Sequence, residues 1–204
     1  MDRVIVYLDY QNVHGWAQRQ FFGVGADAAS THVDPLRLGE LLVSRRQRPS
    51  VLQEVRVYRG RPNPSRQEGA TRANDRQTAA WQRSERVTVI RRNLQYPPTW
   101  PHSPATEKGI DVALAVDVVA LAIQGRCDAA IVFSSDKDLL PAVETVAHLP
   151  GAHVEVAAWC GAPRLHIGHQ KLLVPLPQRV RLRSSPRPAR LLCAGVADYV
   201  VARA

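Results

Sequence analysis

The sequence predicts an α/β protein with a parallel, doubly wound sheet, because short apolar strands alternate with helical segments along most of the chain. The chain has 204 residues, a length that suits one domain with a short appendage. Apolar residues make up 45% of the chain and charged residues 22%, which is ordinary globular usage. A mostly disordered, fibrous or coiled-coil protein is thereby excluded.

Five short segments have the apolar runs or the alternation typical of strands. They cover residues 4–8, 51–58, 87–90, 129–133 and 154–159. Helices are expected over residues 35–44, 67–83, 107–124 and 139–148. Asp34 and Pro35 supply a helix cap and a first-turn proline. The segment 107–124 is apolar nearly all round, so we expect that helix to be buried and to end at Gly125.

The α/β pattern does not extend to the end of the chain. Four prolines make residues 93–106 an irregular loop within the domain. Residues 179–190 hold five arginines and two prolines. We therefore expect a domain over residues 1–175, followed by an Arg/Pro-rich tail or short added element over residues 176–204.

The charge is strongly basic and unevenly distributed. Lys plus Arg number 27 against 18 Asp plus Glu, a net charge of +9. Residues 45–92 hold thirteen arginines and four acids, whereas residues 107–155 hold eight acids and three bases. A basic flank beside an acidic block favours a polyanion partner and a separate site of carboxylates. An arginine-rich surface without such a partner stays equally open.

Cysteine usage and hydropathy indicate a cytoplasmic protein. The three cysteines are far apart and show no metal-ligand spacing. The first residues carry charges where a signal peptide needs an apolar run. Apolar runs stay shorter than the roughly 18 residues of a membrane span, so no membrane association is expected.

Carboxylates follow two of the predicted strands and begin one helix. Because ligands of doubly wound sheets bind at the carboxyl ends of the strands, we expect these groups to meet at one edge. The candidates are Asp9 and Asn12 after the first strand, Asp111 at the start of the apolar helix, and Asp136 and Asp138 after the fourth strand. Clustered carboxylates raise one another's pKa, and a divalent cation such as Mg²⁺ or Mn²⁺ relieves the repulsion. Such a cation activates water for phosphodiester hydrolysis.

Each acid also has an interpretation without a metal. Asp9 could cap a turn, Asp136 and Asp138 could cap the next helix, and Asp111 could complement a helix dipole. Asp117 lies about 120° around the helix from Asp111, so we expect a structural hydrogen-bonding role for it.

Three blocks resemble the NYN domain of the PIN-like nuclease superfamily, which includes the LabA-like group. They are YLDYQN at residues 7–12, EKGIDVALAVDVVALA at 107–122 and IVFSSDKDLLPAVE at 131–144. The blocks stand in family order, and the resemblance covers roughly residues 1–160. It implies a Rossmann-like, PIN-like three-layer domain with a central, mainly parallel sheet of about five strands. It also implies metal-dependent RNA cleavage.

The resemblance assigns roles to residues that match the family blocks. It implies a catalytic set of Asp9, Asn12, Asp111, Asp136 and Asp138, in which Asp9, Asp111 and Asp136 hold Mg²⁺ or Mn²⁺. Lys108 matches a family lysine that could face an RNA phosphate, and Lys137 is an added cation that could contact RNA or point to solvent. Ser135 stands where many members have glycine. A further acid from a middle helix is often present, and Asp75 or the less well placed Glu85 would supply it; a surface helical acid is the alternative.

Arginines at the exit of the second strand are the candidates for RNA binding. Arg59, Arg61 and Arg66 would lie on the same edge of the sheet as the acids and hold the phosphate backbone. Tyr96 and Trp100 in the proline-rich loop could stack bases or pack within their own loop.

Three hypotheses for function follow. The first is a metal-dependent ribonuclease acting on single-stranded or structured RNA. The second is a non-catalytic RNA- or protein-binding regulatory module of the same fold. The third, a small-molecule phosphohydrolase, is disfavoured because the chain has no glycine-rich phosphate loop and no DxDx[TV] motif. A homodimer, or a protein partner bound through the C-terminal segment, remains open.

Overall fold

A single parallel sheet forms the centre of the molecule. The computed structural model describes residues 1–22, 32–159, 162, 165 and 173–175. Six strands pair in parallel in the order β3-β2-β1-β4-β5-β6. Their bounds are β1 Asp2–Asp9, β2 Ser50–Arg61, β3 Val87–Asn93, β4 Ala129–Phe133, β5 His153–Ala158 and β6 Leu173–Pro175.

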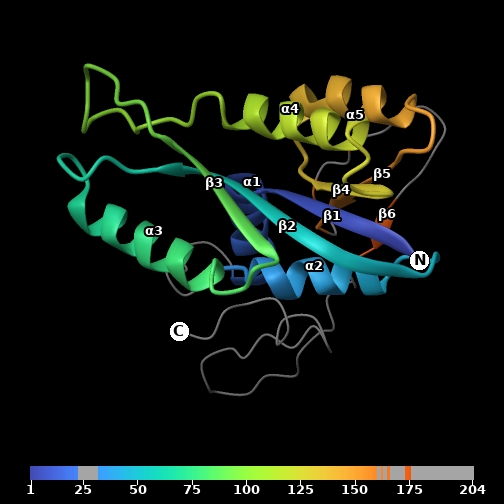
Figure 1. Cartoon of the computed structure of the whole chain (residues 1–204). Coiled ribbons are helices and arrows are strands. Elements are labelled where there is room, and N and C mark those ends of the chain that lie inside the picture. Colours follow the sequence, from blue (N-terminus) through green and yellow to red (C-terminus); the bar gives the residue numbers. More distant parts are fainter. Residues whose placement is uncertain (23–31, 160–161, 163–164, 166–172, 176–204) are drawn as a thin grey trace.

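Helices cover both faces of this sheet and make three layers (Figure 1). Buried side chains of α1, α2 and α3 lie in the core of one face, and those of α4 and α5 lie in the core of the other. The helices are α1 Tyr10–Ala17, α2 Pro35–Ser44, α3 Glu68–Trp81, α4 Ile110–Ile123 and α5 Leu140–Ala147. A π-helical turn, Gln18–Phe22, follows α1, and a 3₁₀ turn, Lys137–Leu139, precedes α5. The predicted three-layer α/β fold is confirmed.

Strand β1 is central because both of its faces are apolar. Val4, Val6 and Leu8 pack into the core on the α1–α2 side. Ile5 and Tyr7 pack into the core on the α4–α5 side. A strand buried on both faces belongs in the interior of a parallel sheet, and β1 lies between β2 and β4.

The segment boundaries agree with the sequence in most places. Asp34 caps α2, since its Oδ1 accepts a hydrogen bond from the Arg37 amide at 2.9 Å. The short strand Leu173–Pro175 and the helix Tyr10–Ala17 were not predicted. The predicted tail over residues 176–204 lies outside the described residues. None of the helices that the structure describes is long and apolar enough to cross a membrane.

The expectation that the apolar helix is buried all round was wrong. Helix α4 begins at Ile110, after Gly109 with φ 74°, and buries one side against the sheet. Its opposite side exposes Val112, Val116 and Ile123, whose exposed fractions are 64%, 58% and 66%. The sequence did not indicate which face of α4 meets the core, because the two faces are distinguished by hydrophobic periodicity and a uniformly apolar helix has none.

Part of the arginine excess serves the fold. The Arg46 guanidinium is buried, with 1% of its side chain exposed. Its Nε donates to Glu155 Oε1 at 2.7 Å, and its Nη1 donates to Asp2 Oδ2 at 3.2 Å. These contacts join the amino end of β1 to β5. Removal of either acid would destabilise the fold, because a buried charge without its partner costs free energy.

Candidate functional site

The strand order reverses between β1 and β4. Chain connections leave β1 toward β2 on one side, while β4 and β5 extend the sheet on the other. In doubly wound folds the crevice at the carboxyl ends of such a pair is where ligands bind. Strand β1 ends at Asp9 and β4 ends at Phe133, so the side chains that follow them decide what this crevice can bind.

Asp9 is a buried carboxylate at the centre of the crevice. Only 4% of its surface is exposed. Its Oδ1 accepts from the Asn12 amide at 3.2 Å and caps α1, and its Oδ2 accepts from the Ser134 hydroxyl at 2.7 Å. Burial first, and the charges of Asp111 and Asp136 to a lesser extent, raise the pKa of Asp9 to about 6 against the two hydrogen bonds, which lower it.

The loop after β4 is tied to Asp9 and to α1 by hydrogen bonds. The Ser135 amide donates to Asn12 Oδ1 at 3.1 Å. The Asp136 amide donates to Ser134 Oγ at 3.0 Å, so the Ser134 hydroxyl links two acids. Asp136 also caps the 3₁₀ turn by accepting from the Asp138 amide at 3.0 Å. Asp9 and Asp136 therefore both act as helix caps, in addition to any role that they have in binding a ligand.

Asp111 lies in the first turn of α4 and faces the same group of charges. Burial raises its pKa, and Asp136 and Asp138 raise it further. The other predicted acids are thus close enough to raise the pKa of Asp9 or of Asp111. No three His, Cys, Asp or Glu side chains of the described residues are close enough, as they stand, to hold a metal ion. The donor set nonetheless fits a hard divalent cation, because it consists of carboxylate oxygens whose repulsion a cation would relieve.

Glu107 is a fifth acid of this crevice that the sequence did not single out. Its Oε1 accepts from the Gly60 amide at 2.5 Å. Burial raises the pKa of Glu107, and the charges of Asp9 and Asp111 add to the effect. A Cβ at residue 60 would lie 2.8 Å from Glu107 Oε1 and 2.3 Å from Leu94 Cδ2, so the glycine leaves room for both side chains. The sequence feature that could have identified Glu107 is its position as the first residue of the EKGID block.

Asp75 is held in an ion pair on α3. Its Oδ1 and Oδ2 accept from Arg61 Nε and Nη2 at 2.9 and 2.7 Å, and Arg91 donates to the same carboxylate. Arg61 first and Arg91 second hold the pKa of Asp75 well below its usual range. The predicted extra acid, Asp75, thus forms an ion pair with Arg61, which was predicted to contact RNA.

Asp117 has the hydrogen-bonding role that its helical position suggested. Its Oδ2 accepts from the Tyr58 hydroxyl at 2.7 Å and from Arg56 Nη2 at 2.8 Å. These bonds fasten the middle of α4 to β2.

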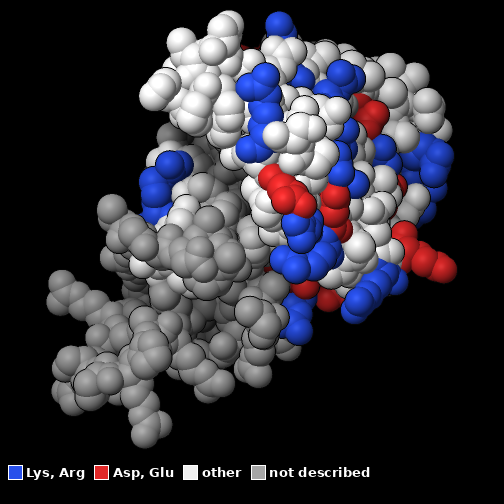
Figure 2. All heavy atoms as spheres, turned by 90° about the vertical axis from the view of Figure 1, so that its left-hand side faces the viewer, with Lys and Arg blue, Asp and Glu red and all other residues white. Residues whose placement is uncertain are grey.

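Basic side chains surround the carboxyl ends of β1, β2 and β3. Figure 2 views the molecule from this side and shows Lys and Arg over much of the face, with a few acids between them. Arg66 is exposed, as are Lys108 and Lys137. Arg92 was not predicted, yet it is exposed and would be 3.6 Å from a Cβ at Gly109, so its guanidinium lies beside the start of α4.

The two candidate stacking aromatics pack within their own region. Tyr96 and Trp100 meet edge to face with ring centroids 5.0 Å apart. The Tyr96 hydroxyl donates to Gln67 Oε1 at 2.8 Å and accepts from the Asn63 amide at 2.8 Å. Arg66 lies over the Tyr96 ring at 5.3 Å. These contacts anchor the proline-rich loop, as the alternative interpretation expected.

The sequence matches the family model of the NYN domain over residues 3–165. The chain belongs to the NYN family. The match covers β1 to β5 and every acid of the crevice, and it carries with it the PIN-like, nuclease-type fold. The narrower LabA-like assignment stays a prediction.

A solved structure has the same fold as this NYN protein. It is a protein of unknown function from Vibrio parahaemolyticus, 15% identical in sequence. The alignment covers 80% of this chain and 85% of that one, with a TM-score of 0.52. Comparison with curated proteins gives no significant match.

Proposed function

We propose that this NYN protein is a metal-dependent ribonuclease that hydrolyses RNA phosphodiester bonds at its aspartate cluster. One observation carries the proposal: Asp9 is buried at the reversal of strand order, and burial together with the charges of Asp111 and Asp136 raises its pKa to about 6. A fold keeps such a repulsive group at a cost in stability, and carboxylates of this kind concentrate at functional sites.

Asp9, Asp111 and Asp136 would hold Mg²⁺ or Mn²⁺. The bound cation would lower the pKa of a water molecule and stabilise charge on the phosphate. The chain's own groups position these ligands. Ser134 orients Asp9 through its hydroxyl, and Asn12 fixes the loop that carries Asp136 through the Ser135 amide. Asp138 would complete the group from the exposed side of the 3₁₀ turn.

The basic face would hold the RNA backbone. Arg66, Lys108 and Lys137 are exposed near the carboxyl ends of the strands, and Arg92 adds a cation beside the start of α4. Phosphate contacts by Lys and Arg supply most of the non-specific affinity for nucleic acids. Arg61 would add to the positive potential of this face, although Asp75 offsets part of its charge. Arg59 would attract the RNA from a half-buried position near Glu107.

A non-catalytic RNA- or protein-binding module is the second candidate. The observation that favours it is that the hydrogen bonds of Asp9, Asn12 and Asp136 all stabilise local structure. A regulatory module would keep those bonds without turnover. The two candidates differ in whether RNA is cleaved when a divalent cation is added.

The test is cleavage of end-labelled RNA by the full chain with Mg²⁺ or Mn²⁺. Wild type is compared with Asp111→Asn, which keeps the side-chain size but removes a charge, and with Asp117→Asn on the same helix. The proposal expects cleavage by wild type and Asp117→Asn, and none by Asp111→Asn or in the presence of chelator. Equal cleavage by all three proteins, or RNA binding without any cleavage, would overturn it.

A further inference from the structure

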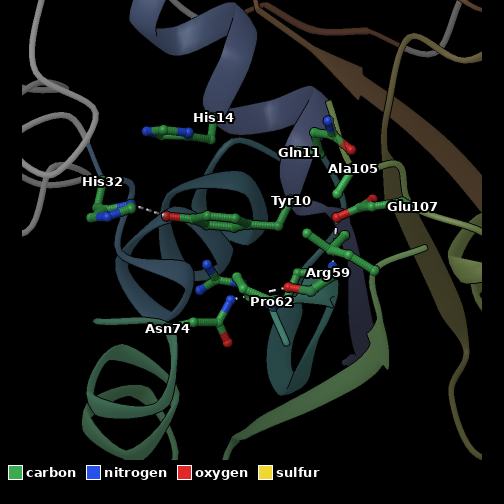
Figure 3. Close-up of a pocket in the computed structure, with 11 residues that line it drawn as sticks. Tyr10, Gln11, His14, His32, Arg59, Pro62, Asn74, Ala105 and Glu107 are labelled. Carbon is green, nitrogen blue, oxygen red and sulfur yellow. Dashed lines mark hydrogen bonds between the residues drawn. The ribbon is translucent and has the colours of Figure 1, made fainter. Parts of the chain in front are cut away.

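A pocket of about 250 Å³ opens beside the acidic crevice (Figure 3). Two of its lining residues connect it to the acids, since Tyr10 directly follows Asp9 and Glu107 stands four residues before Asp111. The side chains that define the pocket come from five parts of the chain. They are Tyr10, His14, His32, Arg59, Asn74 and Glu107.

One wall of the pocket is built from stacked planar groups. The Tyr10 and His14 rings lie nearly parallel, 4° apart in plane, with centroids 5.8 Å apart. The His32 ring stacks on His14 at 4.9 Å. The Arg59 guanidinium carbon lies 5.0 Å from the Tyr10 ring. Tyr10 itself is only 3% exposed and supports the wall from behind, whereas His14, His32 and Arg59 are half-buried. Planar groups such as these three are what unpaired bases stack on in RNA-binding proteins.

The pocket also holds a donor and an acceptor at different places. Arg59 is a donor, and its buried Nε donates to none of the described residues. Glu107 is an acceptor that approaches the pocket through its contact with Gly60 (Figure 3). Asn74 also lines the pocket and is held in place, because its Nδ2 donates to the Gly60 carbonyl at 3.0 Å.

We propose that this pocket binds one unstacked base of the RNA strand and favours guanine. The inference rests on the proposed function for its choice of RNA as the ligand. Guanine pairs adjacent N–H donors, which suit the Glu107 carboxylate, with the O6 and N7 acceptors that arginine commonly contacts. The pocket is smaller than the roughly 300–1,000 Å³ of sites for drug-sized ligands, and this size suits one base.

The position of the pocket gives the base a function. Because Tyr10 directly follows Asp9 and Glu107 stands four residues before Asp111, a base held here sets which phosphodiester lies over the aspartates. The pocket thereby selects the cleavage position relative to a guanine. The exposed arginines and lysines contact only the sequence-independent backbone.

The test measures binding of labelled single-stranded oligonucleotides by fluorescence anisotropy. The protein is the full chain with Asp111→Asn, in chelator, so that cleavage plays no part. A uridine oligonucleotide is compared with ones that carry a single guanosine, adenosine or cytidine. We expect the guanosine oligonucleotide to bind about tenfold more tightly, the discrimination typical of one bidentate base contact. Equal affinity for all four would overturn the proposal.

Glu107→Gln tests which group reads the base. The amide still accepts from Gly60, so thermal melting checks that the fold is kept. We expect this variant to lose the guanosine preference without any weakening of its affinity for plain uridine RNA. Glu68→Gln is the matched control, an exposed acid on α3 bonded to Arg72, and it is expected to keep the preference. An unchanged preference in Glu107→Gln would contradict the assignment.

A second variant separates stacking from base selection. His14→Ala removes part of the stacked wall, so it should weaken binding of all four oligonucleotides by a similar factor. A loss confined to guanosine would contradict the stacking role. These measurements contain no cleavage step. A guanosine preference without nuclease activity would therefore refute the proposed function alone, and cleavage without any base preference would refute this inference alone.

Discussion

The Ser134 hydroxyl donates to Asp9 Oδ2 over 2.7 Å and joins the end of β4 to the end of β1. The contact lies where the strand order reverses, and both residues are buried. The same hydroxyl accepts from the Asp136 amide, so one side chain positions two acids of the proposed metal site. The burial of Asp9 disfavours its charged form more than the hydrogen bonds from Ser134 and Asn12 favour it.

Asp9→Asn is predicted to stabilise the metal-free protein near pH 8. The raised pKa means that ionised Asp9 opposes folding by about 3 kcal/mol when its pKa rises from 3.8 to about 6. The amide keeps a carbonyl oxygen for the cap but carries no charge. We expect the free energy of unfolding, measured by urea titration in chelator, to rise by about 1–3 kcal/mol, with lost hydrogen bonds accounting for the lower end.

The pH dependence gives this prediction its control. The folded-state pKa lies above the unfolded value, so the favourable contribution of Asp9 is complete below pH 3.8 and is lost as pH rises through about 6. The advantage of Asp9→Asn should therefore shrink as pH falls from 8 toward 4. A constant advantage across this range, or a loss of stability at pH 8, would show that the charge on Asp9 is not the cause.

Ser134→Ala is predicted to destabilise the protein and raise the pKa of Asp9 further. The substitution removes a hydrogen bond that favours the ionised carboxylate and leaves the Asp136 amide without its acceptor. We expect a loss of about 1–3 kcal/mol in the free energy of unfolding at pH 8. Ser135→Ala is the control, because the Ser135 contact to Asn12 uses the backbone amide. Similar losses for both serines would contradict the role given to the Ser134 hydroxyl.

Asp117→Asn is predicted to affect stability and leave cleavage unchanged. Its carboxylate accepts two hydrogen bonds that join α4 to β2, one from Tyr58 and one from Arg56. Weakening them should lower the free energy of unfolding by about 1–3 kcal/mol. Cleavage rate per folded molecule, measured well below the melting temperature, should equal that of wild type. A reduced rate there would place Asp117 in the catalytic group.

Asp75→Asn is predicted to tighten RNA binding. Removing this carboxylate frees Arg61 and Arg91 from their ion pairs and makes the face more positive. The affinity for RNA should rise, and its salt dependence should become steeper, because more counterions are released on binding. Cleavage should persist. Loss of cleavage with unchanged affinity would instead support Asp75 as the extra catalytic acid that the family resemblance suggested.

The alternation of strands and helices was predictable because its signals are local. Apolar runs such as residues 129–133 and caps such as Asp34 depend on a few neighbouring residues. Helix Tyr10–Ala17 was missed because its only strong local signal was the cap at Asp9, which sequence analysis weighed as a metal ligand. The exposed face of α4 was missed because an apolar helix gives no periodicity from which to choose a side.

The four aspartates of the crevice were predictable because each follows a strand or begins a helix in a recognisable block. Partners from distant segments were not. Glu107 approaches Gly60 across 47 positions of sequence, and Arg61 pairs with Asp75 only once α3 is folded against the sheet. Such pairings depend on tertiary packing, so the sequence indicated charges at this edge without saying which ones neutralise each other.

Mn²⁺ binding to the metal-free protein, followed by electron paramagnetic resonance of the free ion, tests the central claim most directly. Asp9→Asn and Asp111→Asn remove proposed ligands, and Asp117→Asn removes a carboxylate of the same chemistry that lies in a structural contact. We predict that wild type and Asp117→Asn bind Mn²⁺ equally. The other two should lose more than the roughly 10–100-fold in affinity that loss of an outer-shell partner costs. Equal binding by all four proteins would contradict a metal site at the aspartates.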